Sequence, residues 1–277
     1  MTPSTSALQR LRLSSRVAAV GLLAALFLGG AASPALAHGT DSGARSYVAL
    51  GDSFTAGQGA PPYEAGPCLR SKYSSYPKIA ALAGSYHLVS NNACSGASLS
   101  DIAGQLAGVS SSTRLVTVTI GGIDAGSNAV LAACAPNPAS DLCRATVDIS
   151  LGTIAALPPR LAATYAGIAA AAPQARVVVL NYPRLFQPGL LPLGDLVNSG
   201  TDALNAAIAA GVAGAADPRV TLVDVTQEFT NHGIGARLPF VAYDPANPTA
   251  APNFHPNALG NALGYVRALR QDGILTR

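Results

Sequence analysis

The sequence carries little charge of either sign. Asp, Glu, Lys and Arg make up 11% of its 277 residues, and the 17 basic residues exceed the 14 acidic ones by three. That excess equals the three arginines near the N-terminus, Arg10, Arg12 and Arg16, so the rest of the chain has as many basic as acidic residues. The sequence therefore gives no reason to expect a nucleic acid as partner.

Several motifs of metal, cofactor and repeat proteins are also missing. No C-x-x-C pair and no H-E-x-x-H motif occurs, which makes a zinc site the weaker interpretation of the cysteines. The one near match to a dinucleotide loop, GQGAPP at 57–62, has Pro62 where a third glycine is needed. No repeat with a period of 20 to 50 residues is visible. We therefore expect no metal and no cofactor.

No apolar stretch after residue 37 comes near the roughly 20 residues that cross a membrane. Residues 1–37 themselves have a basic start, an apolar core and a small-residue cleavage site, which is typical of a secretory signal peptide. We expect a secreted mature protein without a transmembrane anchor. Residues 38–44 are predicted to form a flexible leader, and residues 45–277 a single domain that acts as a monomer.

Only four cysteines are present, and all of them follow the signal: Cys68, Cys94, Cys134 and Cys143. Export and an even count favour two disulfides, for which three pairings exist. We expect the pairing of neighbours in the sequence, Cys68 with Cys94 and Cys134 with Cys143. Each bridge then closes one loop and leaves the chain between the pairs free.

Short β-branched runs alternate with longer stretches rich in Ala and Leu. The runs predict strands at residues 46–50, 87–91, 114–120, 175–181 and 219–225. The stretches predict helices at residues 76–84, 100–109, 143–172, 200–215 and 257–271. This alternation indicates an α/β fold with a parallel sheet covered by helices on both faces.

Polar and glycine-rich stretches follow the first three predicted strands: GDS at 51–53, NACSGAS at 92–98 and GGIDAG at 121–126. In parallel sheets of this kind, ligands bind beyond the carboxyl ends of the strands. Two Pro-rich loops complete the expected site. The loop 185–196 is apolar enough to line an acyl pocket, and the loop 243–254 leads to His255.

Ser53 is a candidate nucleophile, although GDS alone fits equally well a turn in which Asp52 caps a helix. A serine hydroxyl needs a neighbouring base and donors that stabilise the oxyanion. Of the four histidines, His255 is the best candidate base, because a proline follows it and suits the first position of a helix. A histidine at a helix start tends to remain neutral, as a base must be.

Four blocks, GDSFTAG, ACSGAS, TIGGIDAG and FHPNALG, occur in the order of the SGNH (GDSL) hydrolase family, and the chain resembles its secreted bacterial lipase and esterase branch. The absence of any G-x-S-x-G agrees, because that motif belongs to a different hydrolase fold. The resemblance implies a flavodoxin-like, three-layer α/β/α sandwich with a parallel five-stranded sheet, and an ester-hydrolysing site. It also implies Ser53 as nucleophile and oxyanion donor, Gly96 as second backbone donor, and His255 as general base.

The third block departs from the family pattern. Its usual asparagine, the third oxyanion donor, is replaced by Ile123, which has no donor. Loss of one such donor typically costs about a hundred- to a thousandfold in turnover. Either Asn128 or another nearby group compensates, or the enzyme is slow, or hydrolysis has been lost. Asp124, next in the chain, is expected to be structural and to bind backbone N–H groups of its own turn.

The fourth block departs as well. The family usually has an aspartate three residues before the histidine, and here that residue is Pro252. Its backbone carbonyl could accept the imidazole N–H and complete a Ser–His dyad. Asp244 is a weaker alternative, because it would have to fold back over a Pro-rich loop.

Two hypotheses follow from these residues. The first is a secreted serine ester hydrolase, a lipase or esterase, that acts on a small-molecule or lipid ester through an acyl-serine intermediate. The second is a catalytically impaired protein of the same fold that binds lipid or glycan outside the cell, for which Ile123 and Pro252 are the evidence. The retention of Ser53, Gly96 and His255 together favours the enzyme.

Overall fold

A computed structural model of the chain describes residues 45–83 and 86–275. The predicted signal peptide, 1–37, and leader, 38–44, lie outside the described residues. No helix within the described ranges is both long enough and apolar enough to span a lipid bilayer.

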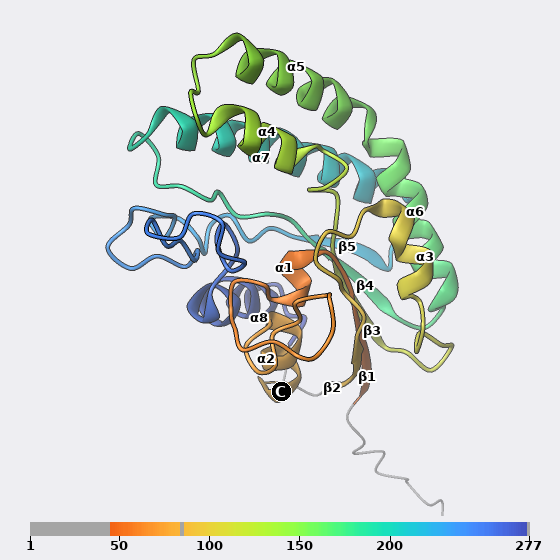
Figure 1. Cartoon of the computed structure of the whole chain (residues 1–277). Helices are drawn as coiled ribbons and strands as arrows, with labels where there is room; N and C mark the ends of the chain where they lie inside the picture. The colour runs from red at the N-terminus through yellow and green to blue at the C-terminus, as the bar shows by residue number, and fades with distance from the viewer. Residues whose placement is uncertain (1–44, 84–85, 276–277) are drawn as a thin grey trace, which may run out of the picture. The chain divides into compact units, whose positions relative to one another are not determined.

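Five parallel strands form a sheet in the order β2-β1-β3-β4-β5, which is the flavodoxin-like order (Figure 1). The strands are β1 Arg45–Gly51, β2 Tyr86–Asn91, β3 Leu115–Thr119, β4 Arg176–Leu180 and β5 Val220–Val223. Every residue of β3 is buried, as expected for a central strand covered on both faces. All five predicted strands are confirmed to within two residues at each end.

Helices cover both faces of the sheet and complete the predicted three-layer sandwich (Figure 1). The helices are α1 Ser53–Ala56, α2 Tyr76–Ala83, α3 Ile102–Gln105, α4 Ser127–Cys134, α5 Asp141–Ala156, α6 Pro158–Ala171, α7 Pro192–Gly214 and α8 Val266–Gln271. Side chains of α3, α5, α6 and α7 form the core on one face. Those of α2 and α8, with the π-helical turn Gly260–Tyr265, form the core on the other.

Four of the five helix predictions were wrong in extent, those at residues 100–109, 143–172, 200–215 and 257–271, and prolines explain the second and third. The predicted helix 143–172 divides at Leu157, because Pro158 and Pro159 begin α6, and proline fits the first turn of a helix but not its interior. Helix α7 begins at Pro192, inside the predicted loop 185–196, for the same reason. The short helix α4 was not predicted at all.

The C-terminal helix also begins later than the sequence suggested. Pro256 does not open it but forms a β-bridge with Val241. The helical turn starts at Ala258, where the Asn257 side chain caps it by accepting the Gly260 N–H at 3.0 Å. His255 therefore precedes an extended residue rather than a helix start, and the predicted effect of a helix dipole on its charge state is lost.

The two disulfides pair the cysteines as expected. Cys68 bonds to Cys94 across 26 residues, and Cys134 bonds to Cys143 across nine. The first joins the loop after α1 to the loop after β2. The second joins the end of α4 to the first turn of α5.

Candidate active site

The turn at the end of β1 fixes Ser53. Gly51 has φ of +131°, and a Cβ there would lie 2.3 Å from the Thr119 carbonyl oxygen, so only glycine fits. Asp52 caps α1 by accepting the Phe54 N–H at 2.9 Å. Ser53 is the first residue of α1 and is 8% exposed. GDS therefore forms a turn in which Asp52 caps a helix, and the same turn holds Ser53 in a fixed position.

The structure brings His255 to Ser53 across 202 residues of sequence. His255 Nε2 lies 2.8 Å from Ser53 Oγ. The loop after α1 packs directly on the histidine, since a Cβ at Gly59 would lie 2.5 Å from the His255 carbonyl oxygen. The Phe54 ring lies against the imidazole, with ring centroids 5.2 Å apart. These contacts leave the Nε2 edge of the imidazole directed at the serine hydroxyl.

The other imidazole nitrogen determines which tautomer is present. His255 Nδ1 donates to the Asn253 carbonyl oxygen at 2.7 Å, so Nε2 is left to accept the Ser53 proton. Burial lowers the pKa of His255 to about 4, against an opposing effect of the Asn253 carbonyl. The imidazole is therefore neutral at any pH well above 4, and a neutral imidazole can accept a proton.

The prediction that Pro252 supplies this carbonyl was wrong by one residue. Phe254 has φ of +62°, in the left-handed region, and the turn it makes goes with an Asn253 carbonyl that faces the ring. Asp244, the alternative, is exposed, and its carboxylate accepts the Ala246 N–H instead. The predicted kind of partner, a backbone carbonyl in place of a carboxylate, is the one found.

Gly96 lies in the loop after β2 with φ of +79°. The Cys68–Cys94 disulfide and the hydrogen bond from Ser95 N–H to the Cys68 carbonyl, 3.1 Å, hold this loop. In the described part of the chain, neither the Gly96 N–H nor the Ser53 N–H has a protein acceptor. Both groups are available to an outside acceptor.

The loop after β3 is organised by a tyrosine that the sequence analysis missed. Tyr182 Oη donates to the Asp52 carboxylate and accepts the Gly122 N–H at 2.9 Å. The Gly122 donor, next to Ile123, is therefore already occupied. Burial raises the pKa of Asp52 to about 7, against the lowering effect of the Tyr182 hydrogen bond. Tyr182 follows β4, so the rule that sites form beyond strand ends could have identified it.

Asp124 is structural, but its partners are not in its own turn. Its carboxylate accepts the Leu99 N–H at 2.9 Å and binds the Arg160 guanidinium at 2.9 Å. The first bond joins the loop of Ile123 to the segment that follows Gly96. Asp124 thus joins the GGIDAG loop to the residue that follows the ACSGAS stretch, rather than closing its own turn.

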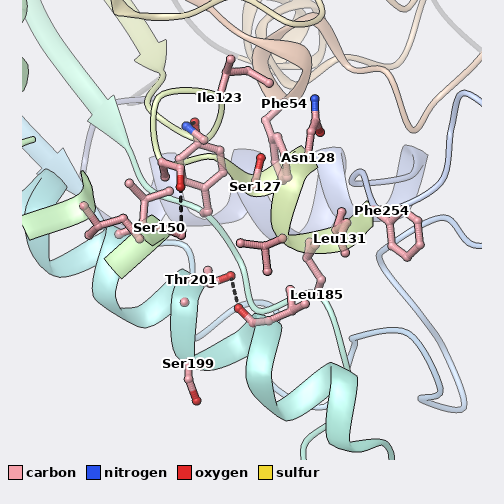
Figure 2. A pocket seen from close by; sticks show the side chains of 18 of the residues that line it. Phe54, Ile123, Ser127, Asn128, Leu131, Ser150, Leu185, Ser199, Thr201 and Phe254 are labelled. Atoms are coloured by element: carbon pink, nitrogen blue, oxygen red, sulfur yellow. Dashed lines mark hydrogen bonds between the residues drawn. The ribbon is translucent and has the colours of Figure 1, made fainter. Parts of the chain in front are cut away.

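A cavity of about 230 Å³ opens beside Ser53 and His255. Figure 2 shows part of its lining. Helices α4, α5 and α7 provide most of its walls, together with Phe54, Ile123 and the start of the loop 185–196. Leu185 and Leu196 from that loop are in the lining, as predicted for an acyl pocket. Asn128 lines the cavity with an exposed side chain, whereas Gly96 is not among its lining residues. Within the described ranges, no three His, Cys, Asp or Glu side chains gather as a metal ion would require.

Comparison with known proteins gives one consistent result. The sequence model of the GDSL-like lipase/acylhydrolase family matches residues 49–263. Lipase 1 of Streptomyces coelicolor is 33% identical over 95% of this chain and 98% of that protein. A lipase of Streptomyces rimosus is 36% identical over 94% and 98%.

Two solved structures are similar over their whole length. The extracellular lipase of Streptomyces rimosus superposes with a TM-score of 0.73 and 33% identity, covering 82% of this chain and 99% of that one. Phospholipase A1 of Streptomyces albidoflavus gives a TM-score of 0.75 and 33% identity over the same shares.

Proposed function

Since the chain belongs to the GDSL-like lipase/acylhydrolase family and is a carboxylic ester hydrolase, we propose that Ser53 and His255 form its catalytic dyad. The observation that carries this proposal is the 2.8 Å contact between Ser53 Oγ and His255 Nε2. The neutral imidazole and the fixed tautomer support it, because a base must be unprotonated at the nitrogen that faces the nucleophile.

The reaction proceeds in two halves. Ser53 Oγ attacks the ester carbonyl carbon while His255 Nε2 takes the hydroxyl proton. The tetrahedral intermediate then expels the alcohol, which leaves with the proton from Nε2, and an acyl-serine remains. Water attacks the acyl-serine as Nε2 accepts one of its protons, and collapse returns that proton to Ser53 Oγ and releases the carboxylic acid.

The N–H groups of Ser53 and Gly96 stabilise the oxyanion of both intermediates. This role is supported by the observation that neither N–H group has a protein acceptor among the described residues, so both are free to bind the oxyanion. Ile123 contributes no third donor, and Gly122 cannot replace it while its N–H binds Tyr182. The Asn253 carbonyl stabilises the imidazolium less than a carboxylate would, because it carries no net charge.

We further infer that the enzyme is secreted and acts as a monomer on lipid or other acyl esters. Its relatives include an extracellular lipase and a phospholipase A1, and the chain has two disulfides, which persist in oxidising compartments. One chain supplies the serine, the histidine and both oxyanion donors, so no second subunit is needed to complete the site.

The test is hydrolysis of p-nitrophenyl esters by the mature protein from His38 onward, beside its Ser53→Ala variant. Activity that disappears in the variant supports the serine mechanism. Equal, background-level rates in both proteins on every ester would overturn the dyad proposal.

A further inference from the structure

A glycine in the middle of α7 faces the cavity beside Ser53. Gly200 lines the cavity together with Leu196, Val197 and Leu204 of the same helix. Residues three or four apart lie on one face of a helix, so Gly200 is at the centre of the face that α7 turns toward the cavity. A Cβ built at Gly200 would find no other atom within 4 Å. The space in front of Gly200 is therefore empty.

The fold gives no reason for a glycine at this position. Two other glycines of α7 are required by packing: a Cβ at Gly194 would lie 2.8 Å from the Phe186 Cβ, and one at Gly211 would lie 2.5 Å from the Leu161 Cβ. Gly200 has neither such a neighbour nor a left-handed backbone. Glycine weakens a helix interior relative to alanine. What an alanine or larger residue would remove here is room in the cavity.

The walls of this cavity suit hydrocarbon better than a sugar. Three hydroxyls of the lining, labelled in Figure 2, already donate to backbone carbonyls: Ser150 to Ala125 at 2.6 Å, Ser199 to Asp195 at 2.9 Å and Thr201 to Val197 at 3.0 Å. Their donor protons are therefore not available to a ligand. Most other side chains around them are apolar.

The size of the cavity limits what it can hold. An engineered protein cavity of about 150 Å³ takes one benzene, so 230 Å³ corresponds to on the order of nine carbon atoms. That is one acyl chain of medium length, with the rest of an ester outside.

We propose that Gly200 is a specificity-determining residue, which keeps this cavity open for one medium-length acyl chain of the ester that Ser53 attacks. This inference rests on the proposed role of Ser53 as the nucleophile. A side chain at position 200 would occupy the space of the chain's distal carbons without displacing protein atoms.

The first experiment compares p-nitrophenyl acetate with p-nitrophenyl decanoate for the wild type, Gly200→Leu and a control. Gly167→Leu is the matched control, because Gly167 is also a helical glycine with no atom within 4 Å of a Cβ, but it is exposed on α6 and outside the cavity. We expect Gly200→Leu to lower the decanoate-to-acetate ratio of kcat/KM about tenfold or more, since a single methylene in an apolar pocket is worth that much. Gly167→Leu leaves the ratio unchanged. An unchanged ratio in Gly200→Leu, with both variants folded by circular dichroism, overturns the proposal.

The second experiment does not depend on turnover. Isothermal titration calorimetry measures decanoate binding to Ser53→Ala and to the double variant Ser53→Ala/Gly200→Leu. We expect the double variant to bind about tenfold more weakly or worse. Equal binding overturns the role of Gly200. Weaker binding together with no Ser53-dependent ester hydrolysis by the wild type would mean that the dyad proposal fails while the chain-binding cavity stands.

Discussion

Tyr182 joins the loops that follow β1, β3 and β4. Its hydroxyl donates to buried Asp52 and accepts the Gly122 N–H, and its ring packs edge-on against Phe54 at 4.9 Å. Tyr182→Phe keeps the ring and leaves both partners without this bond. We expect the free energy of unfolding in urea to fall by about 1–3 kcal/mol, the cost of an unsatisfied buried group.

Tyr165→Phe is the control for that substitution. The Tyr165 hydroxyl is also buried, but it has no hydrogen-bond partner among the described residues. Its removal should leave stability unchanged or slightly raise it, because no bond is lost. Equal losses in the two variants would mean that the Tyr182 bonds contribute nothing beyond the hydroxyl itself.

The pH dependence of hydrolysis should reflect the low pKa of His255. Its burial lowers the pKa from 6.5 to about 4, and only the neutral ring can accept the Ser53 proton. Activity should therefore persist below pH 6 and decline as the pH falls through about 4. A profile of kcat/KM for a p-nitrophenyl ester measures this, with stopped assays below pH 6. A decline centred near 6.5 would show that the imidazole is not desolvated in the free enzyme.

Ile123→Asn tests the missing oxyanion donor. A side-chain amide at this position adds a donor in the loop that borders Ser53, and one such donor is worth about a hundred- to a thousandfold in kcat in other hydrolases. We expect kcat to rise, up to that limit. Ile123→Val, which shortens the side chain without adding a donor, is the control. A fall or no change in Ile123→Asn would mean that this site stabilises the oxyanion differently.

The sequence identified the two residues of the proposed dyad, which lie 2.8 Å apart in the structure, but not the residue that orients the histidine. Ser53 and His255 stand in short motifs whose chemistry is local to one turn each. The carbonyl that binds His255 depends on the backbone of Phe254, a residue type that rarely adopts a left-handed conformation. A prediction from spacing therefore chose Pro252, one residue too early.

Elements were predictable where one signal dominated. Strands β3 and β4 are β-branched runs that are buried on both faces, so their composition and length agreed with the tertiary structure. Helix α7 was underestimated because Pro192 in a proline-rich stretch resembles a loop, although proline fits the first turn of a helix. Helix α4 has a left-handed glycine, Gly126, at its N-cap and no side-chain cap, so its start carries no strong sequence signal.

The empty space beside Gly200 in α7 predicts that an alanine there would stabilise the protein. Gly200→Ala should raise the free energy of unfolding by about 0.5–1 kcal/mol, because alanine costs less conformational entropy in a helix and its Cβ meets no atom. Gly211→Ala is the contrasting variant in the same helix. Its Cβ would lie 2.5 Å from the Leu161 Cβ, so it should lose about 1–3 kcal/mol to overpacking. Urea unfolding of both variants checks the pair. Destabilisation by Gly200→Ala would mean that the glycine serves the fold and not the cavity.

At the scale of the whole molecule, the two disulfides hold different parts of the site. Cys68–Cys94 fixes the loop that carries Gly96, two residues after Cys94. Cys134–Cys143 joins α4 to α5, which together form much of the cavity wall. Removing the first should therefore affect turnover on every ester, whereas removing the second should affect long acyl chains more than short ones.

The two bridges also differ in the stability that they contribute. By loop-closure entropy, the 26-residue separation is worth about 3.5 kcal/mol and the nine-residue separation about 2.5 kcal/mol. We expect Cys68→Ala/Cys94→Ala to lose more stability than Cys134→Ala/Cys143→Ala, and to lose kcat on p-nitrophenyl acetate as well, because the Gly96 donor is no longer held. The second variant should retain acetate turnover and lose decanoate turnover. Thermal unfolding measures the stability of both variants, and kcat on p-nitrophenyl acetate and decanoate measures their turnover. If the Cys134–Cys143 variant lost acetate turnover as severely as the Cys68–Cys94 variant, the α4–α5 pair would be holding Ser53 and His255 themselves rather than only the wall that receives the acyl chain.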